Sequence, residues 1–390
     1  MAIVVGCGGS STHTIRVYEN RAARSGRQID LHVVVLHATG RPVAPDPIVW
    51  LTGGPGMAAT NDAALVRSLF SALRVHHDIV LVDQRGTGQS AALECHIYDR
   101  ANLQPYFDTM WPVDKIRDCR QQLSTHADLA QYTTANAMDD LADVLTALGY
   151  AKADIIGVSY GTQAAFAFMR RHPDRVRKVV LNGVMPPDQI LFSMTPRVDS
   201  NPIIDSAMKL LPVKVVLWNW RRLRHDTVTI TRADFEERVF MILYAPSRGR
   251  RMVSKLRQAL AGDWRPFAEL ALSESFWRHS GRSIGMQLSV LCTENAPRLA
   301  HSDTKSPLVR ELLAACAEWP RGAIAPEDTT RVISSLPVLL MSGGLDPATP
   351  PAMADSAALG LSNSTRFVDS TAGHAMFYDK QIALITSFIM

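Results

Sequence analysis

The chain has 390 residues, of which 47% are hydrophobic and 20% are charged, so it can bury a large apolar core. Its formal net charge of +4 is small for this length, and no basic block carries interleaved aromatic residues, which argues against a nucleic-acid partner. No apolar run approaches the length of a membrane span, and the sequence shows neither internal repeats nor low-complexity segments.

The first twelve residues, 1–12, have the character of an N-terminal tail. Within them Val4 to Cys7, followed by glycines and serines, resemble the lipobox and tether of a bacterial lipoprotein. On this interpretation the protein is exported to the periplasm or the extracellular space, and Cys7 carries a lipid anchor. The alternative is an ordinary tail.

The other four cysteines fall into two pairs with equal spacing. Cys95 lies 24 residues before Cys119, and Cys292 lies 24 residues before Cys316. Because the sequence contains no C-x-x-C motif, we expect two local disulfides instead of a metal or redox site. Paired cysteines favour an oxidising compartment. The alternative is four buried free thiols.

The segment 13–186 alternates between strand-like and helix-like patterns. Two β-branched runs near its start predict an antiparallel hairpin, and the later strand–helix units predict a mostly parallel sheet with helices on both faces. The expected elements are strands over 14–18, 29–36, 45–50, 79–82, 155–156 and 176–181, and helices over 61–73, 137–148 and 163–171.

The expected strand at 155–156 leads directly into a G-x-S-x-G sequence, residues 157–161. A strand, a sharp turn and a helix in this order are the context of a nucleophile elbow, in which small residues must flank the serine. The helix N-terminus below the serine favours developing negative charge. We therefore predict that Ser159 is a catalytic nucleophile; the alternative is a serine that only starts the helix.

After Pro186 the strand–helix alternation is lost, and helical patterns rich in tryptophan dominate. A helical lid inserted into an α/β core is the natural interpretation. The core resumes with a buried strand over 336–341, a helix over 352–359 and a last strand over 365–368. The predicted division is an N-terminal tail 1–12, a first core part 13–186, a helical lid 187–332 and a second core part 333–390.

Three residues at the expected carboxyl ends of strands form a candidate catalytic triad. A serine hydroxyl is a weak nucleophile at neutral pH and needs a base, for which His374 is the candidate. Asp346 would hold the imidazole tautomer and stabilise its charged form. The chain order Ser159, Asp346, His374 is that of the α/β-hydrolases. Taken singly, Asp346 is also consistent with a turn and His374 with an ordinary loop histidine.

Residues 52–56, Thr-Gly-Gly-Pro-Gly, predict an oxyanion loop. Glycines let backbone N–H groups approach a substrate oxygen closely. One donor would come from this loop, at Gly54, and the other from the residue after the nucleophile, Tyr160. The alternative is a simple turn.

Together these motifs resemble the proline iminopeptidase and tripeptidyl aminopeptidase family of α/β-hydrolases, particularly the exported bacterial tripeptidyl-aminopeptidase-like group. The resemblance implies that Asp83 and Arg85 brace the loops around the site. Proline iminopeptidases usually carry histidine at the position of Thr52, and the lid is shorter than in the family. The matching segments are 53–56, 83–88, 157–162, 337–340, 344–350 and 373–374.

Within the lid, residues 290–294 resemble the family's V-x-C-x-E segment. In aminopeptidases of this fold, lid carboxylates bind the free amino group of the substrate. The resemblance therefore makes Glu294 the candidate for substrate binding, with Glu269 and Glu274 as weaker candidates. The alternative is a solvated surface glutamate.

We therefore expect a serine hydrolase that releases residues or short peptides from free peptide N-termini through an acyl-enzyme on Ser159. This chemistry requires no metal or cofactor, and the expected partner is a peptide or a small acyl substrate. Two alternatives stay open. One is an esterase or other acyl hydrolase on the same scaffold, because fold and triad do not fix the acyl group. The other is a non-catalytic binding protein on a hydrolase fold.

Overall fold

In a computed structural model of the chain, the structure describes residues 4–6, 9–95, 97, 99, 101–190, 201–279, 281–299 and 307–390. Cys7, the candidate lipid-anchor site, lies outside the described residues. Within the described ranges, no helix combines the length and the apolar character needed to cross a membrane.

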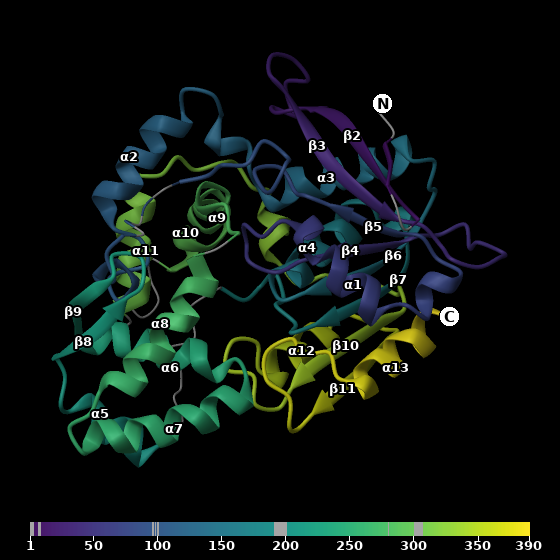
Figure 1. The fold of residues 1–390 in the computed structure, drawn as a ribbon. Coiled ribbons are helices and arrows are strands. Elements are labelled where there is room, and N and C mark those ends of the chain that lie inside the picture. Colours follow the sequence, from purple (N-terminus) through teal and green to yellow (C-terminus); the bar gives the residue numbers. More distant parts are fainter. Residues whose placement is uncertain are drawn as a thin grey trace.

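A nine-stranded sheet forms the centre of the described chain (Figure 1). Its strands are β1 (Val4–Gly6), β2 (Ser10–Tyr18), β3 (Gln28–Leu36), β4 (Ile48–Leu51), β5 (Ile79–Val82), β6 (Ala153–Val158), β7 (Val176–Asn182), β10 (Val338–Gly343) and β11 (Ser364–Asp369). The spatial order is β1-β2-β3-β5-β4-β6-β7-β10-β11. The pairs from β1 to β5 are antiparallel, and all pairs from β5 to β11 are parallel.

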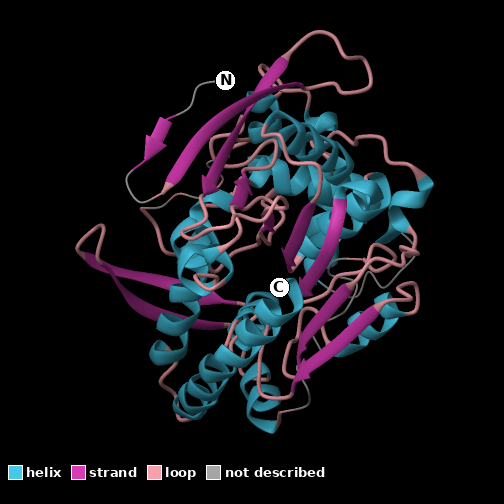
Figure 2. Ribbon diagram, turned by 90° about the vertical axis from the view of Figure 1, so that its right-hand side faces the viewer, coloured by secondary structure: helices cyan, strands magenta, loops and turns pink. Residues whose placement is uncertain are grey.

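Helices cover both faces of this sheet (Figure 2). They are α1 (Ala63–Leu69), α3 (Thr134–Ala147), α4 (Tyr160–Arg171), α12 (Pro351–Ala358) and α13 (Asp379–Ile389). Side chains alternate along each strand, so Val49 and Leu51 of β4 pack with α3, α4 and α12, whereas Ile48 and Trp50 pack with α1 and α13. This arrangement confirms the predicted fold class, a mostly parallel α/β-hydrolase sheet with helices on both faces.

Strands β2 and β3 confirm the predicted antiparallel hairpin, but β2 begins earlier than expected. Ser10 pairs with Leu36 and Thr12 with Val34, and β1 pairs with the same end of β2, so residues 4–6 and 10–12 of the predicted 1–12 tail belong to the sheet. The polar side chains of residues 10–12 gave no apolar strand pattern, so the sequence did not predict this end of β2. Ser11 is nevertheless buried, and its hydroxyl lies 2.8 Å from the ring nitrogen Nε2 of His13.

The lid consists of two packed groups of elements. The first group contains α2 (Val113–Leu123), α9 (Ile284–Val290), the π-helical turn η6 (Leu291–Asn295), α10 (Ala296–Leu299) and α11 (Pro307–Ala317). The second contains α5 (Pro202–Met208), β8 (Val213–Asn219), β9 (Arg224–Ile230), α6 (Arg232–Leu243), α7 (Pro246–Leu260) and α8 (Arg265–His279).

Two features of this lid differ from the sequence-based expectation. Helix α2 falls in the segment assigned to the first core part, yet its buried side packs with the lid helices α9 and α11. The chain between β5 and α3 therefore adds a second insertion to the lid. The lid also contains strands, because β8 and β9 form an antiparallel hairpin where only helices were expected.

The predicted cysteine pairing is confirmed. Cys95 is bonded to Cys119 of α2, and Cys292 of η6 is bonded to Cys316 of α11. Both bonds lie within the first lid group. In the chain-entropy model, a disulfide that closes a loop of this length contributes roughly 3 kcal/mol, so the two bonds stabilise the first lid group.

Candidate active site

Ser159 lies on the sharp turn between β6 and α4. Its backbone has φ 56° and ψ −122°, a conformation that residues other than glycine rarely adopt. The turn leaves no room for side chains on either side. A Cβ atom at Gly157 would lie 2.6 Å from the carbonyl oxygen of Gly161, and one at Gly161 would lie 2.1 Å from that of Leu51. The two glycines of the motif are therefore required by this nucleophile-elbow geometry.

The three residues of the candidate triad lie together. Nε2 of His374 is 2.9 Å from the Ser159 hydroxyl oxygen, and Nδ1 is 2.8 Å from Oδ2 of Asp346. The Asp346 carboxylate also accepts hydrogen bonds from the backbone N–H groups of Ala348 and Thr349 and from the Thr349 hydroxyl. Burial alone would raise the pKa of Asp346, but His374 and the Thr349 hydrogen bonds together lower it, so the carboxylate stays ionised.

The lid contacts His374 directly. The backbone N–H of His374 donates to the carbonyl oxygen of Tyr244 at 2.8 Å, and the two rings meet edge to face with centroids 4.6 Å apart. Tyr244 immediately follows α6 and is part of the lid. Sequence reasoning missed this residue because a single tyrosine at the end of a lid helix gives no signal of its own.

The predicted oxyanion groups border the same space. A Cβ atom on Gly53 would lie 3.3 Å from Cβ of Ser159, so the oxyanion loop passes close to the nucleophile. Gly54 has φ 125°, in the region that favours glycine. Tyr160 is the first residue of α4, where a backbone N–H has no acceptor within the helix. Gly54 and Tyr160 both line the cavity that contains Ser159 and His374.

This cavity has a volume of about 380 Å³ and lies between the core and the lid. Its wall is mostly apolar, with the side chains of Met57, Met110, Met185, Ile190, Phe240, Met241, Leu308, Met353, Met376 and Phe377. Among the lining residues that the structure describes, the Asp, Glu and Arg side chains are Asp62, Arg248, Glu274 and Arg282. In the described residues, no group of three or more His, Cys, Asp and Glu side chains is placed to hold a metal ion.

Thr52, the position at which the sequence departs from proline iminopeptidases, also lines the cavity. Its hydroxyl donates to Oδ2 of Asp62 at 2.6 Å, and the Trp50 indole N–H donates to the same oxygen at 2.9 Å. These two bonds fix the orientation of the Asp62 side chain on the core side of the cavity.

Glu294 does not line the cavity, which corrects its predicted contact with the substrate. The V-x-C-x-E segment forms η6, and this turn holds Glu294 against the N-terminus of α3. Oε1 accepts from the backbone N–H of Thr134 at 2.7 Å and Oε2 from its hydroxyl at 2.8 Å. The Thr134 hydroxyl in turn lies 2.7 Å from that of Tyr160. Glu294 therefore caps a helix behind the oxyanion residue.

Among the described residues of the lid, the carboxylate that lines the cavity belongs to Glu274, one of the weaker candidates. Its Oε2 lies 2.5 Å from a guanidinium nitrogen of Arg248, which also lines the cavity. Glu269, the other weaker candidate, is exposed and is not among the lining residues.

We expect Glu294 to make the protein less stable as pH rises from about 4.5 to about 7. Burial raises the pKa of Glu294 to about 7 from an ordinary value of 4.5. The folded state thus holds the proton more tightly than the unfolded state. This contribution to stability is full below pH 4.5 and is lost as pH rises through about 7. Its size is on the order of 3 kcal/mol.

The measurement is urea unfolding at several pH values between 4 and 8. Glu294→Gln copies the shape of the protonated form, so its stability should fall less over this interval than that of the parent protein. Glu269→Gln is the matched control, because Glu269 is an exposed lid glutamate. Identical pH dependence in the parent and Glu294→Gln proteins would contradict the expectation.

Asp83 and Arg85 brace the surrounding loops, as the resemblance implied. Asp83 is fully buried and accepts hydrogen bonds from the backbone N–H groups of Thr60 and Gln89 at 2.9 and 3.0 Å. These bonds tie the loop after β5 to the chain that follows the oxyanion loop.

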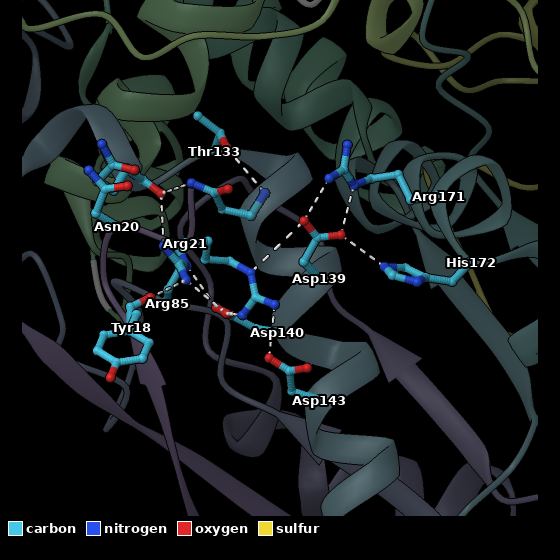
Figure 3. A network of polar contacts seen from close by, with 12 residues as sticks. Tyr18, Asn20, Arg21, Arg85, Thr133, Asp139, Asp140, Asp143, Arg171 and His172 are labelled. Carbon is cyan, nitrogen blue, oxygen red and sulfur yellow. Dashed lines mark hydrogen bonds and ion pairs between the residues drawn. The ribbon is translucent and has the colours of Figure 1, made fainter. Parts of the chain in front are cut away.

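Arg85 lies in a buried polar network (Figure 3). Its guanidinium forms a two-pronged ion pair with Asp140 of α3, with both N–O distances 2.7 Å. It also donates to the carbonyl oxygens of Glu19 and Gln131 at 2.8 and 3.0 Å. Arg21 binds the same Asp140 carboxylate at 2.7 Å. The network joins the β2–β3 hairpin, the loop after β5 and α3.

Parts of the chain are similar in sequence to known hydrolases and peptidases. The putative hydrolase YuaR of Escherichia coli (strain K12) is 28% identical over 145 residues, which cover 37% of this chain and 29% of that protein. The tripeptidyl aminopeptidase of Streptomyces coelicolor is 29% identical over 178 residues, covering 42% and 33% respectively. The proline iminopeptidase of Xylella fastidiosa (strain 9a5c) is 28% identical over 160 residues, covering 40% and 37%.

The aligned regions thus span between 29% and 37% of the length of these three relatives. A family model described as the alpha/beta hydrolase fold matches residues 46–381, which include Ser159, Asp346 and His374 and most of both core parts. This match extends over most of the sequence and agrees with the sheet order and the elbow described above. The chain belongs to the alpha/beta hydrolase fold family.

Proposed function

We propose that the protein is a serine hydrolase that releases residues or short peptides from free peptide N-termini. The observation that carries the proposal is the position of His374, which bridges Ser159 and Asp346 at 2.9 and 2.8 Å beside an apolar cavity. The two disulfides favour a location of the protein in an oxidising compartment outside the cytoplasm.

The geometry suits acyl transfer through a covalent intermediate. Ser159 attacks the substrate carbonyl carbon while His374 takes the hydroxyl proton. The backbone N–H groups of Gly54 and Tyr160 stabilise the oxyanion that forms. His374 then gives its proton to the leaving amine, the C–N bond breaks, and the acyl group remains on Ser159. Finally, His374 activates a water molecule that hydrolyses the acyl-enzyme.

Specificity for a free amino group is supported by two observations. Two of the relatives that align with this chain are named tripeptidyl aminopeptidase and proline iminopeptidase. The cavity wall also contains a lid carboxylate, Glu274, beside Arg248. An α-ammonium group that enters this apolar space would share the carboxylate with Arg248 and form a charge-assisted hydrogen bond.

A second candidate function is supported by the cavity wall itself. Six of the lining side chains named above are methionines, which accept apolar groups of varied shape. An esterase with a hydrophobic acyl group would use the same triad and the same oxyanion loop. The two functions differ in whether the substrate needs a positive charge.

We expect Glu274→Gln to lower kcat/KM on aminoacyl and tripeptidyl aryl amides by roughly tenfold to a hundredfold, because a charged hydrogen bond is worth about 1.5 to 3 kcal/mol. Hydrolysis of a small aryl ester should barely change, since its acyl group makes no such contact. N-acetylated amides should be poor substrates of the parent enzyme. Initial rates on these three substrate classes provide the measurement.

Glu294→Gln serves as the control, because Glu294 is a buried lid glutamate that does not line the cavity. It should affect all three substrate classes to the same degree. Faster turnover of esters than of free-amino amides, with no preference for a free amine, would favour the esterase. If a fluorophosphonate fails to label the protein at all, both enzymatic proposals are wrong and the fold serves a binding function.

A further inference from the structure

The β8–β9 hairpin has two faces of opposite character. Its inner face is buried in the second lid group through Val215, Leu217, Val228 and Ile230. Its outer face and its turn are open to solvent. In Figure 1 the hairpin lies at the left-hand margin of the molecule, remote from the nine-stranded sheet.

Large apolar side chains are exposed on this outer face and at the turn. Val216 and Trp218 of β8 are 54% and 53% exposed, and Trp220 and Leu223 at the turn are 59% and 75% exposed. Across the hairpin, Trp218 pairs with His225, and the two rings meet edge to face at 5.1 Å. Single exposed apolar residues are ordinary, but four on one hairpin form a patch that marks an interaction site.

The same hairpin carries an excess of positive charge. Residues 213–230 contain Lys214, Arg221, Arg222 and Arg224, against one acidic residue, Asp226. Asp226 is already paired with Arg224 at 3.1 Å. The Arg221 guanidinium lies 4.8 Å from the centre of the Trp220 ring. Basic and aromatic residues are therefore interleaved at the turn, which corrects the sequence-based statement that no basic block of the chain carries aromatic residues.

Tryptophan next to arginine is the side-chain chemistry of a bilayer interface. Indole rings sit at the level of the lipid headgroups, and arginine and lysine are attracted to anionic headgroups. A protein partner would also accept tryptophan and arginine, but the one-sided charge of the hairpin specifies a negative surface. We propose that the β8–β9 hairpin docks the protein onto a membrane surface that contains anionic phospholipids.

This docking would be peripheral. The hairpin would insert Trp218, Trp220 and Leu223 among the headgroups while the backbone remains hydrogen-bonded within the β8–β9 pair. The inference rests on the hairpin alone and does not depend on the proposed hydrolase activity. Because β8 and β9 pack in the same lid group as α6, membrane contact would occur on the lid and not on the sheet.

The test is co-sedimentation of the full-length chain with vesicles of phosphatidylcholine, either alone or with part of the lipid replaced by phosphatidylglycerol. Every protein also carries Cys7→Ser, so that no acyl chain at that position contributes. We expect binding to the anionic vesicles, weak binding to the neutral ones and loss of binding at high salt. Trp218→Ser with Trp220→Ser should lower binding to the anionic vesicles at least tenfold.

The matched control is Leu359→Ser, which removes an apolar side chain outside the hairpin that is more exposed, at 76%, than either tryptophan. It should bind anionic vesicles as the parent protein does. The thermal melting temperature of each variant is compared with that of the parent protein to check that the variant is folded. Equal binding of the double tryptophan variant and the parent, or no binding to anionic vesicles at low salt, would overturn the proposal. So would a parent dimer in solution that the tryptophan variant no longer forms, since the patch would then serve a second copy of the chain.

Discussion

Replacing Ser159 by alanine is expected to lower the turnover rate by about 10⁴- to 10⁶-fold while the fold stays intact. The Ser159 hydroxyl is the only part removed, and it lies 2.9 Å from Nε2 of His374. Alanine keeps the Cβ atom, so the strained backbone at φ 56° is no less tolerated than with serine. The elbow and its flanking glycines should therefore fold as before.

Steady-state rates and fluorophosphonate labelling together measure this effect. His374→Ala and Asp346→Asn should cause comparable losses that do not add to that of Ser159→Ala, because the three groups act as one unit. Ser362→Ala is the control, since Ser362 is exposed and belongs to the turn before β11. A Ser159→Ala protein that retains a tenth of the parent activity would remove Ser159 from the role of nucleophile.

The core and the elbow could be read from the sequence because local patterns encode them. The close contacts of Gly157 and Gly161 are made to residues of the same turn and of the adjacent strand β4, so a five-residue motif carries most of the geometry. Strand alternation in the core is equally local. The choice of Ser159, Asp346 and His374 rested on their places at the carboxyl ends of expected parallel strands and on their chain order, which is that of the α/β-hydrolases.

The lid could not be read in this way. Glu274 and Glu294 are both glutamates of lid helices, and nothing in their local sequence says which one faces the cavity. Tertiary packing determines the direction of the Glu294 side chain. The disulfide between Cys292 and Cys316 holds η6 against α11, and Glu294 then contacts the first turn of α3. The resemblance at the V-x-C-x-E segment predicted a substrate contact for Glu294, but a short sequence match does not determine which way a side chain of the lid points.

The β8–β9 hairpin was missed for a related reason. A half-buried strand shows alternating apolar and polar residues, but the exposed positions of β8 include Val216 and Trp218. These two residues make the strand uniformly apolar in its centre and obscure the period of two. The feature that hid the hairpin in the sequence is therefore the same feature that makes its outer face a docking surface.

Removal of the Asp140 carboxylate should cause the largest loss of stability that we predict. Arg85 is fully buried, and Asp140 binds it through both carboxylate oxygens (Figure 3). In Asp140→Ala the Arg85 charge stays buried without its carboxylate, and Arg21, which shared that carboxylate, is left close to a like charge. Breaking one side of a buried ion pair typically costs about 3 to 5 kcal/mol.

Urea unfolding with Asp30→Ala as the control measures this loss. Asp30 is also paired with an arginine, Arg16, at 2.7 Å, but both side chains are well exposed, so its removal should cost less than about 1 kcal/mol. The double variant Arg85→Met with Asp140→Leu removes both charges and should lose less stability than the sum of the two single changes, since neither charge is then left unpaired. If Asp140→Ala costs no more than Asp30→Ala, the Arg85 network does not hold the loops around Ser159 in place.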